Sequence, residues 1–452
     1  MKIDKKELME KYLPEIKKEI KNLVAISSYK RGPKGSPVDK EVEQALDYAL
    51  NLAKSFGFKT FKAKDARYGY ADFGDKPELF GILCHLDVVP PGDLNEWNSS
   101  PFEVIEKDGK LIGRGVFDDK GPTIINLYAV KCLIDHGFEF DYTIRFIFGT
   151  SEETTWECME AYVKNERLVD RGYVPDGNFP VVYAEKYIAD MDIVSQEKAD
   201  FELKGGEIYN VVCDLVSFVG PQLNKLQEFI NNDKKNNLKT YIKDGKLFVK
   251  GKSSHGSLPQ YGICASTYTC WALTQIGVKH QLVNFIANNF WGNNELKQFF
   301  GETQDETGTL TWCNGIINID SQSSRFTLNF RIPCVKNTTD TIVEPMKKIL
   351  TKEGFEFKLI KTENRIYQPI DGEIVTKIMD VYKEVTGDQN AKPIAIGGGT
   401  FAKSMPNLLA FGAEFDNTNS TMHTPNEFLP LSDLEKMFEI YVKSLIKLTK
   451  KD

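Results

Sequence analysis

The sequence predicts an α/β protein whose mostly parallel sheet, covered by helices on both faces, is interrupted by a large inserted α+β domain. Strand and helix patterns alternate between about residues 79 and 186, which is typical of a parallel sheet covered on both faces. Between about residues 188 and 366, alternating polar and apolar stretches indicate antiparallel strands with helices between them. The first kind of alternation resumes near residue 374 and continues to residue 448.

The individual elements are predicted from the spacing of apolar residues. Apolar residues at helical spacing predict helices over residues 5–26, 41–56, 123–136, 156–165, 374–385 and 431–448. Short apolar or alternating runs predict strands over residues 79–84, 142–148, 180–183, 247–249, 326–330 and 408–411. Because 452 residues are too many for one ordinary core, we expect one discontinuous domain over residues 1–186 and 368–452. Residues 187–367 would form the inserted domain.

Composition and charge narrow the class of protein. The net charge of −7 argues against a nucleic-acid partner, because phosphate binding needs concentrated positive charge. No run of eighteen apolar residues occurs, so we expect no membrane span. The charged N-terminal segment lacks the apolar stretch of a secretory signal. None of the eight cysteines forms a CxxC pair, so we expect reduced cysteines in a cytoplasmic protein.

The first candidate site residue is His85, near the end of the apolar strand in GILCHLDVVP. On a strand, His85 and Asp87 point the same way because side chains alternate with period two. A metal-binding imidazole usually needs a carboxylate or carbonyl on its second nitrogen to fix its orientation. The pair therefore suits a metal ligand and its orienting partner, although an ordinary polar strand end has the same pattern.

Acidic residues stand at two further junctions between predicted elements. Asp118 and Asp119, in GRGVFDDKGP, lie at a strand–loop–helix junction. Glu152 and Glu153 come directly after the strand in YTIRFIFGT. In an α/β sheet, such junctions are where ligands collect. The alternative is that these acids only cap the helices that follow them.

Two more candidates complete a possible set of five ligands. Asp176 lies in PDGNFP, ahead of a predicted strand, and His423 lies in MHTPNE, ahead of the last helix. The ligand order is then His, Asp, Glu, Asp, His, in which one of the two adjacent glutamates binds metal and the other is left as a general base. Three carboxylates against two dications leave one positive charge for a hydroxide to neutralise, which suits two metals about 3.5–4 Å apart. Nitrogen and oxygen ligands without thiolate fit zinc, manganese or cobalt.

The order of these motifs resembles a known family. HxDVVP, GRGxxDDKGP, SEE, PDGxFP, GKSSHGSLP and HxxNE follow one another along the chain. This order is similar to that of the two-metal aminoacyl peptidases, which include carnosinase, glutamate carboxypeptidase, aminoacylase and succinyl-diaminopimelate desuccinylase. The resemblance is strongest to the bacterial dipeptidase V and Xaa-His dipeptidase branch, and it extends from His85 to Glu427.

The resemblance implies two divalent metal ions per chain, zinc foremost and manganese or cobalt as alternatives. His85 and Asp176 would bind one ion. Glu153 and His423 would bind the other, and Asp118 would bind both.

The resemblance also implies how the metal set is supported. Asp87 would orient His85, and Glu152 would be the general base. A cis peptide bond between Asp118 and Asp119 would aim Asp118 at both metals.

The inserted domain carries the residues implied in substrate binding. His255, in GKSSHGSLP, would polarise the scissile carbonyl, and Asn210, in YNVV, would assist it. Arg331, in NFRIP, would grip the substrate carboxylate. A loop beside this arginine would be formed by Gly397, Gly398, Gly399 and Thr400.

The activity that these residues imply is that of a metal-dependent dipeptidase. Such an enzyme would use metal-activated water to hydrolyse short peptides with a free C-terminal carboxylate. A carboxypeptidase or N-acyl-amino-acid deacylase of the same chemistry is the alternative, and a catalytically inactive binding protein on this fold is the non-enzyme alternative. Residues 1–186 and 368–452 would be the catalytic domain, with residues 187–367 as lid and substrate-binding domain. The resemblance also implies that the large insertion replaces a partner subunit, which favours a monomer.

Overall fold

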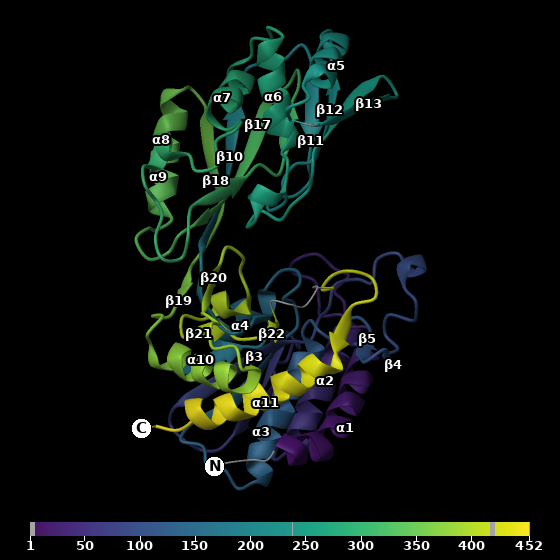
Figure 1. Cartoon of the computed structure of the whole chain (residues 1–452), viewed down its shortest axis with the longest axis vertical. Coiled ribbons are helices and arrows are strands. Elements are labelled where there is room, and N and C mark those ends of the chain that lie inside the picture. The colour runs from purple at the N-terminus through teal and green to yellow at the C-terminus, as the bar shows by residue number, and fades with distance from the viewer. Residues whose placement is uncertain (1–4, 237, 416–420, 452) are drawn as a thin grey trace. The chain divides into compact units, whose positions relative to one another are not determined.

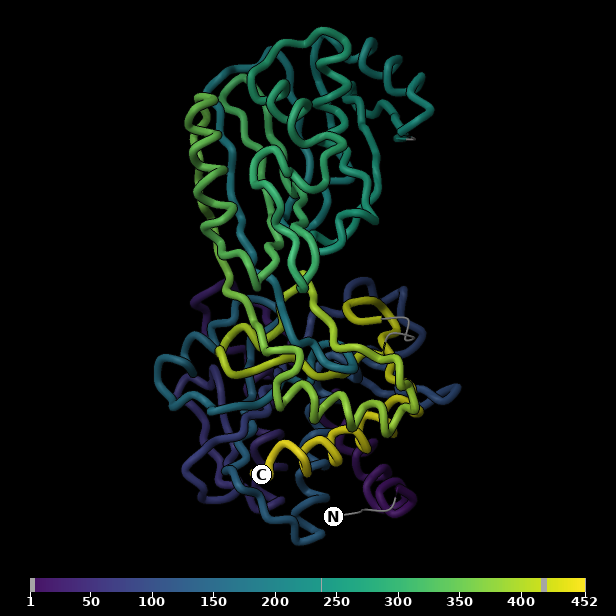
Figure 2. Tube along the Cα trace, turned by 60° about the vertical axis from the view of Figure 1, so that its left-hand side comes forward, coloured from purple at the N-terminus to yellow at the C-terminus, as the bar shows by residue number. Residues whose placement is uncertain are grey.

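The computed structural model describes residues 5–236, 238–415 and 421–451, and it divides into two compact units (Figure 1). Unit 1 comprises Met1–Tyr183, Gln368–Ile394 and Thr400–Asp452. Unit 2 comprises Ala184–Tyr367 and Ala395–Gly399. Figure 2 shows that unit 1 contains both the purple N-terminal and the yellow C-terminal parts of the chain. Its first segment ends near the boundary predicted after residue 186, whereas the return of 395–399 to unit 2 had no sequence signal.

The helices and strands of unit 1 confirm most of the predicted elements. The helices are α1 (Lys5–Val24), α2 (Lys40–Ser55), α3 (Lys120–Asp135), α4 (Glu157–Asn165), α10 (Glu373–Thr386) and α11 (Leu431–Leu448). The strands are β1 (Lys59–Lys62), β2 (Tyr68–Phe73), β3 (Leu79–His85), β4 (Ile105–Lys107), β5 (Lys110–Ile112), β6 (Thr143–Gly149), β7 (Arg171–Val174), β8 (Gly177–Asn178), β21 (Leu408–Ala410), β22 (Ala413–Glu414) and β23 (Phe428–Pro430). Three short strands contain or adjoin the unit boundaries: β9 (Val182–Glu185), β19 (Ile366–Tyr367) and β20 (Ile394–Ile396).

The main sheet of unit 1 is parallel at its centre. Its strand order begins β1-β2-β6-β3-β7-β21-β9, and the neighbours β6, β3, β7 and β21 pair in parallel. All residues of β3 and β6 are buried, which explains their nearly continuous apolar sequences. The expectation of a mostly parallel sheet needs one correction, because β1, β2 and β9 pair antiparallel with their neighbours. The loop between β1 and β2 is too short for a parallel crossover.

Helices cover both faces of this sheet. On β2, Tyr68 contacts Tyr162 of α4, whereas a side chain on Gly69 would meet Leu46 and Leu50 of α2. Successive strand residues face opposite sides, so α2 and α4 lie on opposite faces. Helices α1, α3, α10 and α11 pack with one another and with α2 in one layer.

Unit 2 is an antiparallel α+β domain with its own core, as predicted. The strands are β10 (Tyr187–Ser195), β11 (Glu202–Gly205), β12 (Leu215–Val219), β13 (Lys239–Lys243), β14 (Lys246–Lys250), β15 (Thr311–Cys313), β16 (Ile317–Ile319), β17 (Ser324–Ile332) and β18 (Glu356–Glu363). The helices are α5 (Leu223–Asn232), α6 (Ala265–Gln275), α7 (Gln281–Asn289), α8 (Lys297–Phe300) and α9 (Asp340–Lys352). Strand order is β13-β14-β12-β11-β16-β17-β10-β18, with β15 also on β17.

In the part of the chain that the structure describes, no helix has both the length and the hydropathy that a bilayer crossing requires.

Candidate metal centre

The strand order of unit 1 explains why distant acids and histidines meet. Strands β6, β3 and β7 are adjacent and parallel, so their carboxyl ends share one edge of the sheet. His85 is the last residue of β3, Glu152 and Glu153 follow β6, and Asp176 follows β7. The sheet therefore brings all four residues to one place.

Asp118 and His423 reach this place from loops. Asp118 precedes α3, and its peptide bond to Asp119 is cis, as the resemblance implied. The Asp119 carboxylate accepts the backbone N–H of His85 at 3.0 Å, which ties the loop to the end of β3. His423 comes from the segment between β22 and β23.

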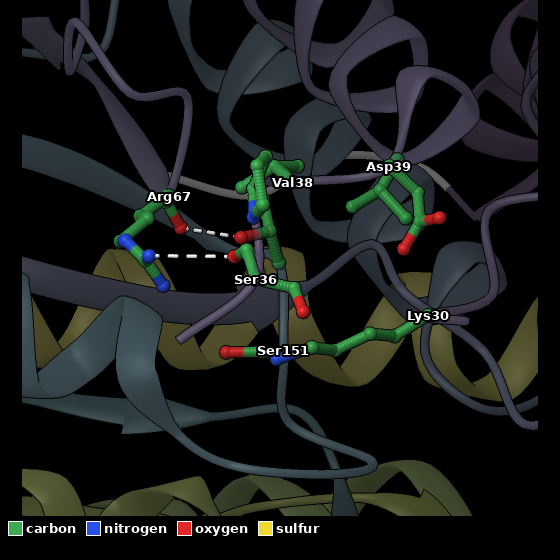
Figure 3. A pocket seen from close by; sticks show the side chains of 9 residues that line it. Lys30, Ser36, Val38, Asp39, Arg67 and Ser151 are labelled. Atoms are coloured by element: carbon green, nitrogen blue, oxygen red, sulfur yellow. Dashed lines mark hydrogen bonds between the residues drawn. The ribbon is translucent and has the colours of Figure 1, made fainter. Parts of the chain in front are cut away.

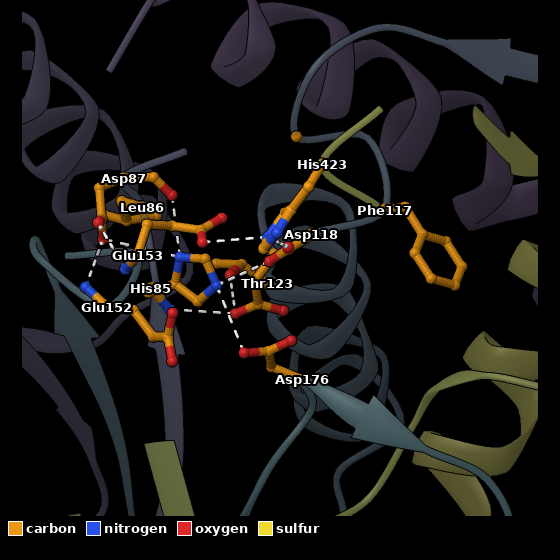
Figure 4. Close-up of polar contacts among 12 residues, drawn as sticks. His85, Leu86, Asp87, Phe117, Asp118, Thr123, Glu152, Glu153, Asp176 and His423 are labelled. Carbon is orange, nitrogen blue, oxygen red and sulfur yellow. Dashed lines mark hydrogen bonds and ion pairs between the residues drawn. The ribbon is translucent and has the colours of Figure 1, made fainter. Parts of the chain in front are cut away.

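Five of these six residues, all except Glu152, form two groups that share Asp118 (Figure 4). His85 Nε2 lies 2.9 Å from Asp118 Oδ1 and 3.5 Å from Asp176 Oδ2. His423 Nε2 lies 3.0 Å from Asp118 Oδ2 and 3.1 Å from Glu153 Oε2. Within each group all the potential ligand atoms lie within 4.8 Å of one another. Asp118 thus offers one carboxylate oxygen to each group.

Asp87 supports the cluster through both its backbone oxygen and its carboxylate. His85 Nδ1 lies 2.9 Å from the backbone oxygen of Asp87 but 3.7 Å from its carboxylate. Because a carbonyl only accepts, Nδ1 carries the hydrogen and Nε2 keeps its lone pair for the cluster. The Asp87 carboxylate instead accepts the backbone N–H groups of Glu152 at 3.0 Å and Glu153 at 3.1 Å. It therefore positions the two glutamates.

Several buried carboxylates lie close together in this cluster, so nearby positive charge would stabilise their ionised forms. Burial and the nearby Asp118 carboxylate raise the pKa of Glu153 to about 7. Burial, together with Asp176 and Glu153, also raises the pKa of Glu152. Hydrogen bonds to Asp118 and Glu153 raise the pKa of His423 to about 10. Two divalent cations would supply this charge in place of protons.

The donor set fits such cations. Each group combines one imidazole nitrogen with carboxylate oxygens and contains no thiolate, which suits zinc, manganese or cobalt. Glu153 Oε1 is buried and has no hydrogen-bond partner among the described residues. An unpaired buried carboxylate oxygen is costly, and a cation would satisfy it.

Sequence reasoning missed Glu427, although it ends the quoted motif HxxNE. Glu427 is fully buried, and its Oε1 accepts the backbone N–H groups of Gly115 at 3.0 Å, Phe117 at 3.0 Å and Asp118 at 3.2 Å. Its Oε2 accepts a hydrogen bond from Arg114 at 2.7 Å. This carboxylate holds the Asp118 loop in shape. The available signal was an acidic residue at the end of the motif that contains His423.

In unit 2 the structure groups several of the predicted substrate-binding residues. Arg331 Nη1 donates to the backbone oxygen of Gly397 at 2.9 Å. Burial and the charge of Arg331 lower the pKa of His255. The bridge between Val211 and His255 places Asn210 beside the His255 loop.

The rest of the glycine loop is divided between the units. Gly398 and Gly399 belong to unit 2, as Gly397 does, whereas Thr400 belongs to unit 1. The Thr400 hydroxyl accepts the backbone N–H of Ala402 at 3.2 Å. For Thr400 the structure therefore shows a helix-capping contact.

A small pocket adjoins the glutamate segment through Ser151 (Figure 3). Lys30, Asp39 and Arg67 are among its lining residues. Lys30 donates to Glu157, at the start of α4, at 2.6 Å. The pocket contains none of the predicted ligands, so we interpret its polar residues as anchors of the loop before α2.

Comparisons with known proteins agree with this geometry. The model of "Peptidase family M20/M25/M40" matches residues 81–447. A Staphylococcus saprophyticus protein named "Putative dipeptidase" is 33% identical over 97% of this chain and 98% of its own length. One of the same description from Staphylococcus haemolyticus is 32% identical over 98% of this chain and 99% of its own.

Solved structures share the fold. Human carnosine dipeptidase 1 superposes with a TM-score of 0.58 at 14% identity, covering 98% of this chain and 97% of that one. Aminoacylhistidine dipeptidase from Vibrio alginolyticus superposes with a TM-score of 0.60 at 12% identity, covering 98% of each chain. The resemblance inferred from the motifs is confirmed, and the chain belongs to the peptidase family M20/M25/M40.

Proposed function

We propose that this chain is a two-metal dipeptidase that hydrolyses the amide bond of short peptides with a free C-terminal carboxylate. The observation that carries the proposal is the pair of histidine–carboxylate groups that share Asp118. The family and the descriptions of the staphylococcal relatives support the same activity.

In this proposal each group of ligands would hold one ion. His85 and Asp176 would hold the first, Glu153 and His423 would hold the second, and Asp118 would serve both. Two bound divalent cations, zinc or else manganese or cobalt, would lower the pKa of water and polarise the scissile carbonyl.

Glu152 is the proposed general base. It accepts a proton from the attacking water and then donates that proton to the leaving amine. Asp87 fixes the backbone of Glu152 through the 3.0 Å hydrogen bond from its N–H, so the side chain starts from a rigid turn. Glu153 belongs to the same turn, and its side chain is the proposed metal ligand.

The residues of unit 2 are proposed to recognise the substrate. Arg331 presents a planar guanidinium, which suits a carboxylate because its N–H groups can bind both oxygens. His255 is the proposed donor to the carbonyl oxygen on which charge develops, with Asn210 assisting it. The loop formed by Gly397, Gly398, Gly399 and Thr400 is proposed to line the substrate beside Arg331.

The activity is tested with a panel of free dipeptides, N-acyl amino acids and longer peptides. Dipeptide hydrolysis that disappears on chelation and returns on adding Zn²⁺, Mn²⁺ or Co²⁺ is the expected result. Preference for N-acyl amino acids would instead indicate a deacylase, and release of C-terminal residues from longer peptides a carboxypeptidase. If no member of the panel were hydrolysed after the metal had been restored, an enzymatic role would be contradicted.

We also infer a cytoplasmic monomer. None of the eight cysteines, all of which lie in the described part of the chain, is in a disulfide, which fits a reducing compartment, and unit 2 buries a core of its own. Cell fractionation tests the cytoplasmic location, and light scattering of the purified protein tests the monomeric state.

A further inference from the structure

The sheet of unit 2 carries a row of polar residues along two neighbouring strands. Asp190 of β10 lies directly opposite Asn329 of β17 in the register. Arg331 is two residues further along β17 and therefore shares a face with Asn329. Leu328 and Phe330 alternate with them and belong to the hydrophobic core. The polar residues thus lie on the face of the sheet that points away from this core.

Hydrogen bonds join these residues into a chain. Asn329 Nδ2 donates to Asp190 Oδ1, and Arg331 Nε donates to Asn329 Oδ1 at 2.9 Å. Arg331 Nη1 donates to the backbone oxygen of Gly397 at 2.9 Å. Two of the three guanidinium nitrogens are therefore held, while Nη2 has no acceptor among the described residues.

The same amide also packs against the loop that carries His255. A Cβ added to Gly256 would lie 2.9 Å from Asn329 Oδ1, so the loop approaches the amide as closely as glycine permits. The Gly256 N–H donates to the backbone oxygen of Asn210 at 2.7 Å. Asn329 is therefore hydrogen-bonded to Arg331 and lies beside the loop that carries His255.

Only an amide can satisfy both neighbours of residue 329. Asn329 is 1% exposed and Arg331 is 3% exposed, and buried polar groups need partners. The amide oxygen accepts from Arg331 while the amide nitrogen donates to Asp190. A carboxylate in its place would face Asp190 as a like charge, and an apolar side chain would leave both partners unpaired.

We propose that Asn329 and Asp190 are positioning residues, which hold the Arg331 guanidinium so that its Nη2 group faces the carboxylate of a bound peptide. This inference rests on the proposed function. Asp190 fixes the orientation of the amide, and the amide fixes the guanidinium. Specificity for a free C-terminus then depends on residues that need not touch the substrate.

The experiment compares a good dipeptide with its C-terminal amide. For each substrate, kcat and KM are measured in the wild type, in Asn329→Ala and in Asp190→Ala. Loss of a hydrogen bond to a charged group predicts a fall in kcat/KM of about tenfold to a hundredfold for the free carboxylate. The fall should be mainly in KM, and kcat/KM for the amide should change little, so the ratio between the substrates collapses.

Two controls separate positioning from general damage. Asp192→Asn removes a charge two residues along β10, where Asp192 binds Arg325 at 2.8 Å, and should leave the substrate ratio unchanged. Asn329→Asp keeps the side-chain size and should also collapse the ratio, which covers the case in which Asn329→Ala fails to fold.

Several results would overturn the inference. An equal loss for both substrates in the folded variants would indicate only a structural role, and an unchanged ratio would exclude any role. A wild type that cleaves dipeptides and their amides equally would also overturn it while leaving the dipeptidase activity intact. A wild type that cleaves no dipeptide would refute the proposed function itself.

Discussion

The shared carboxylate of Asp118 organises the candidate metal centre. Its two oxygens lie 2.9 Å from His85 Nε2 and 3.0 Å from His423 Nε2. Contacts with these imidazoles lower the pKa of Asp118 against the effect of burial. Glu152 and Glu153, although adjacent in sequence, have different expected roles, because only Glu153 belongs to a potential ligand group.

Glu152→Gln is expected to retain both metals and to lose catalysis. An amide cannot accept the proton of the attacking water, so kcat should fall by about 10²–10⁴-fold with a small change in KM. Metal analysis and steady-state kinetics measure the two effects.

The matched variant is His423→Ala, which removes a proposed ligand from the second group. It should lose about one metal equivalent per chain while the fold survives. If Glu152→Gln lost metal as well, Glu152 would be a ligand and the assignment of a general base would be wrong.

At the scale of elements, side chains connect segments that are far apart in the sequence. Glu427, just before β23, binds Arg114 across 313 residues of chain and accepts three backbone N–H groups of the Asp118 loop. Lys30, before α2, binds Glu157 at the start of α4. Such contacts hold irregular loops where regular hydrogen bonding is lacking.

Glu427→Gln is expected to destabilise unit 1 and to weaken metal binding. Breaking a buried ion pair leaves the Arg114 charge uncompensated, which costs about 3–5 kcal/mol. Denaturant unfolding measures the loss, and metal titration measures the affinity. The double variant Arg114→Met with Glu427→Gln should recover part of the stability, because it contains no unpaired charge. A single variant as stable as the wild type would show that Glu427 does not hold the loop.

Glu157→Gln is expected to change how stability depends on pH. Burial raises the pKa of Glu157, but hydrogen bonds from Lys30, Thr155 and the Gly35 N–H outweigh it and lower the pKa to about 2. A lowered folded-state pKa stabilises the protein above the usual value of 4.5, and this contribution disappears as the pH falls towards about 2. The wild type should exceed the variant by about 1.5–3 kcal/mol near pH 7, with the difference vanishing in acid.

The control for this measurement lies on the same helix. Glu160 binds Lys34 at 2.7 Å, but both side chains are about 60% exposed, so the pair is screened by solvent. Glu160→Gln should leave the free energy of unfolding nearly unchanged at every pH. A pH-independent difference between the wild type and Glu157→Gln would contradict the assigned ion pair.

At the scale of the whole molecule, the chain forms two units with separate interiors. The core of unit 2 is built from residues between Ala189 and Phe355. All five proposed ligands belong to unit 1, on segments that precede and follow the insertion. The proposed metal site therefore depends on joining the two ends of the chain in one sheet.

Metal removal is expected to destabilise unit 1 selectively. A ligand that binds only the folded state stabilises it by about 2.7 kcal/mol at one hundred times its dissociation constant. On chelation, hydrogen exchange should therefore accelerate in β3, β6 and α3 but not in β10 and β17. Restoring the metal should restore protection. Equal acceleration in both units would contradict a metal site confined to unit 1.

The sequence alone was sufficient to predict the types of most elements and the candidate ligands. Apolar periodicity depends on which face of an element is buried, and it predicted a strand over residues 79–84 and a helix over residues 431–448, where the structure has β3 and α11. The proposed ligands His85 and Asp176 were candidates because they stand at the ends of predicted strands. The order of motifs then identified the family.

Only the tertiary structure decided which residues contact one another. Asp87 contacts the His85 ring through its backbone oxygen rather than its carboxylate, which depends on the local turn. Asn329 meets Asp190 because of the register between β10 and β17, and Glu427 meets Arg114 because β23 pairs with β5. Spacing along a chain constrains which residues share a face. It does not determine strand partners or register, which result from packing the whole core.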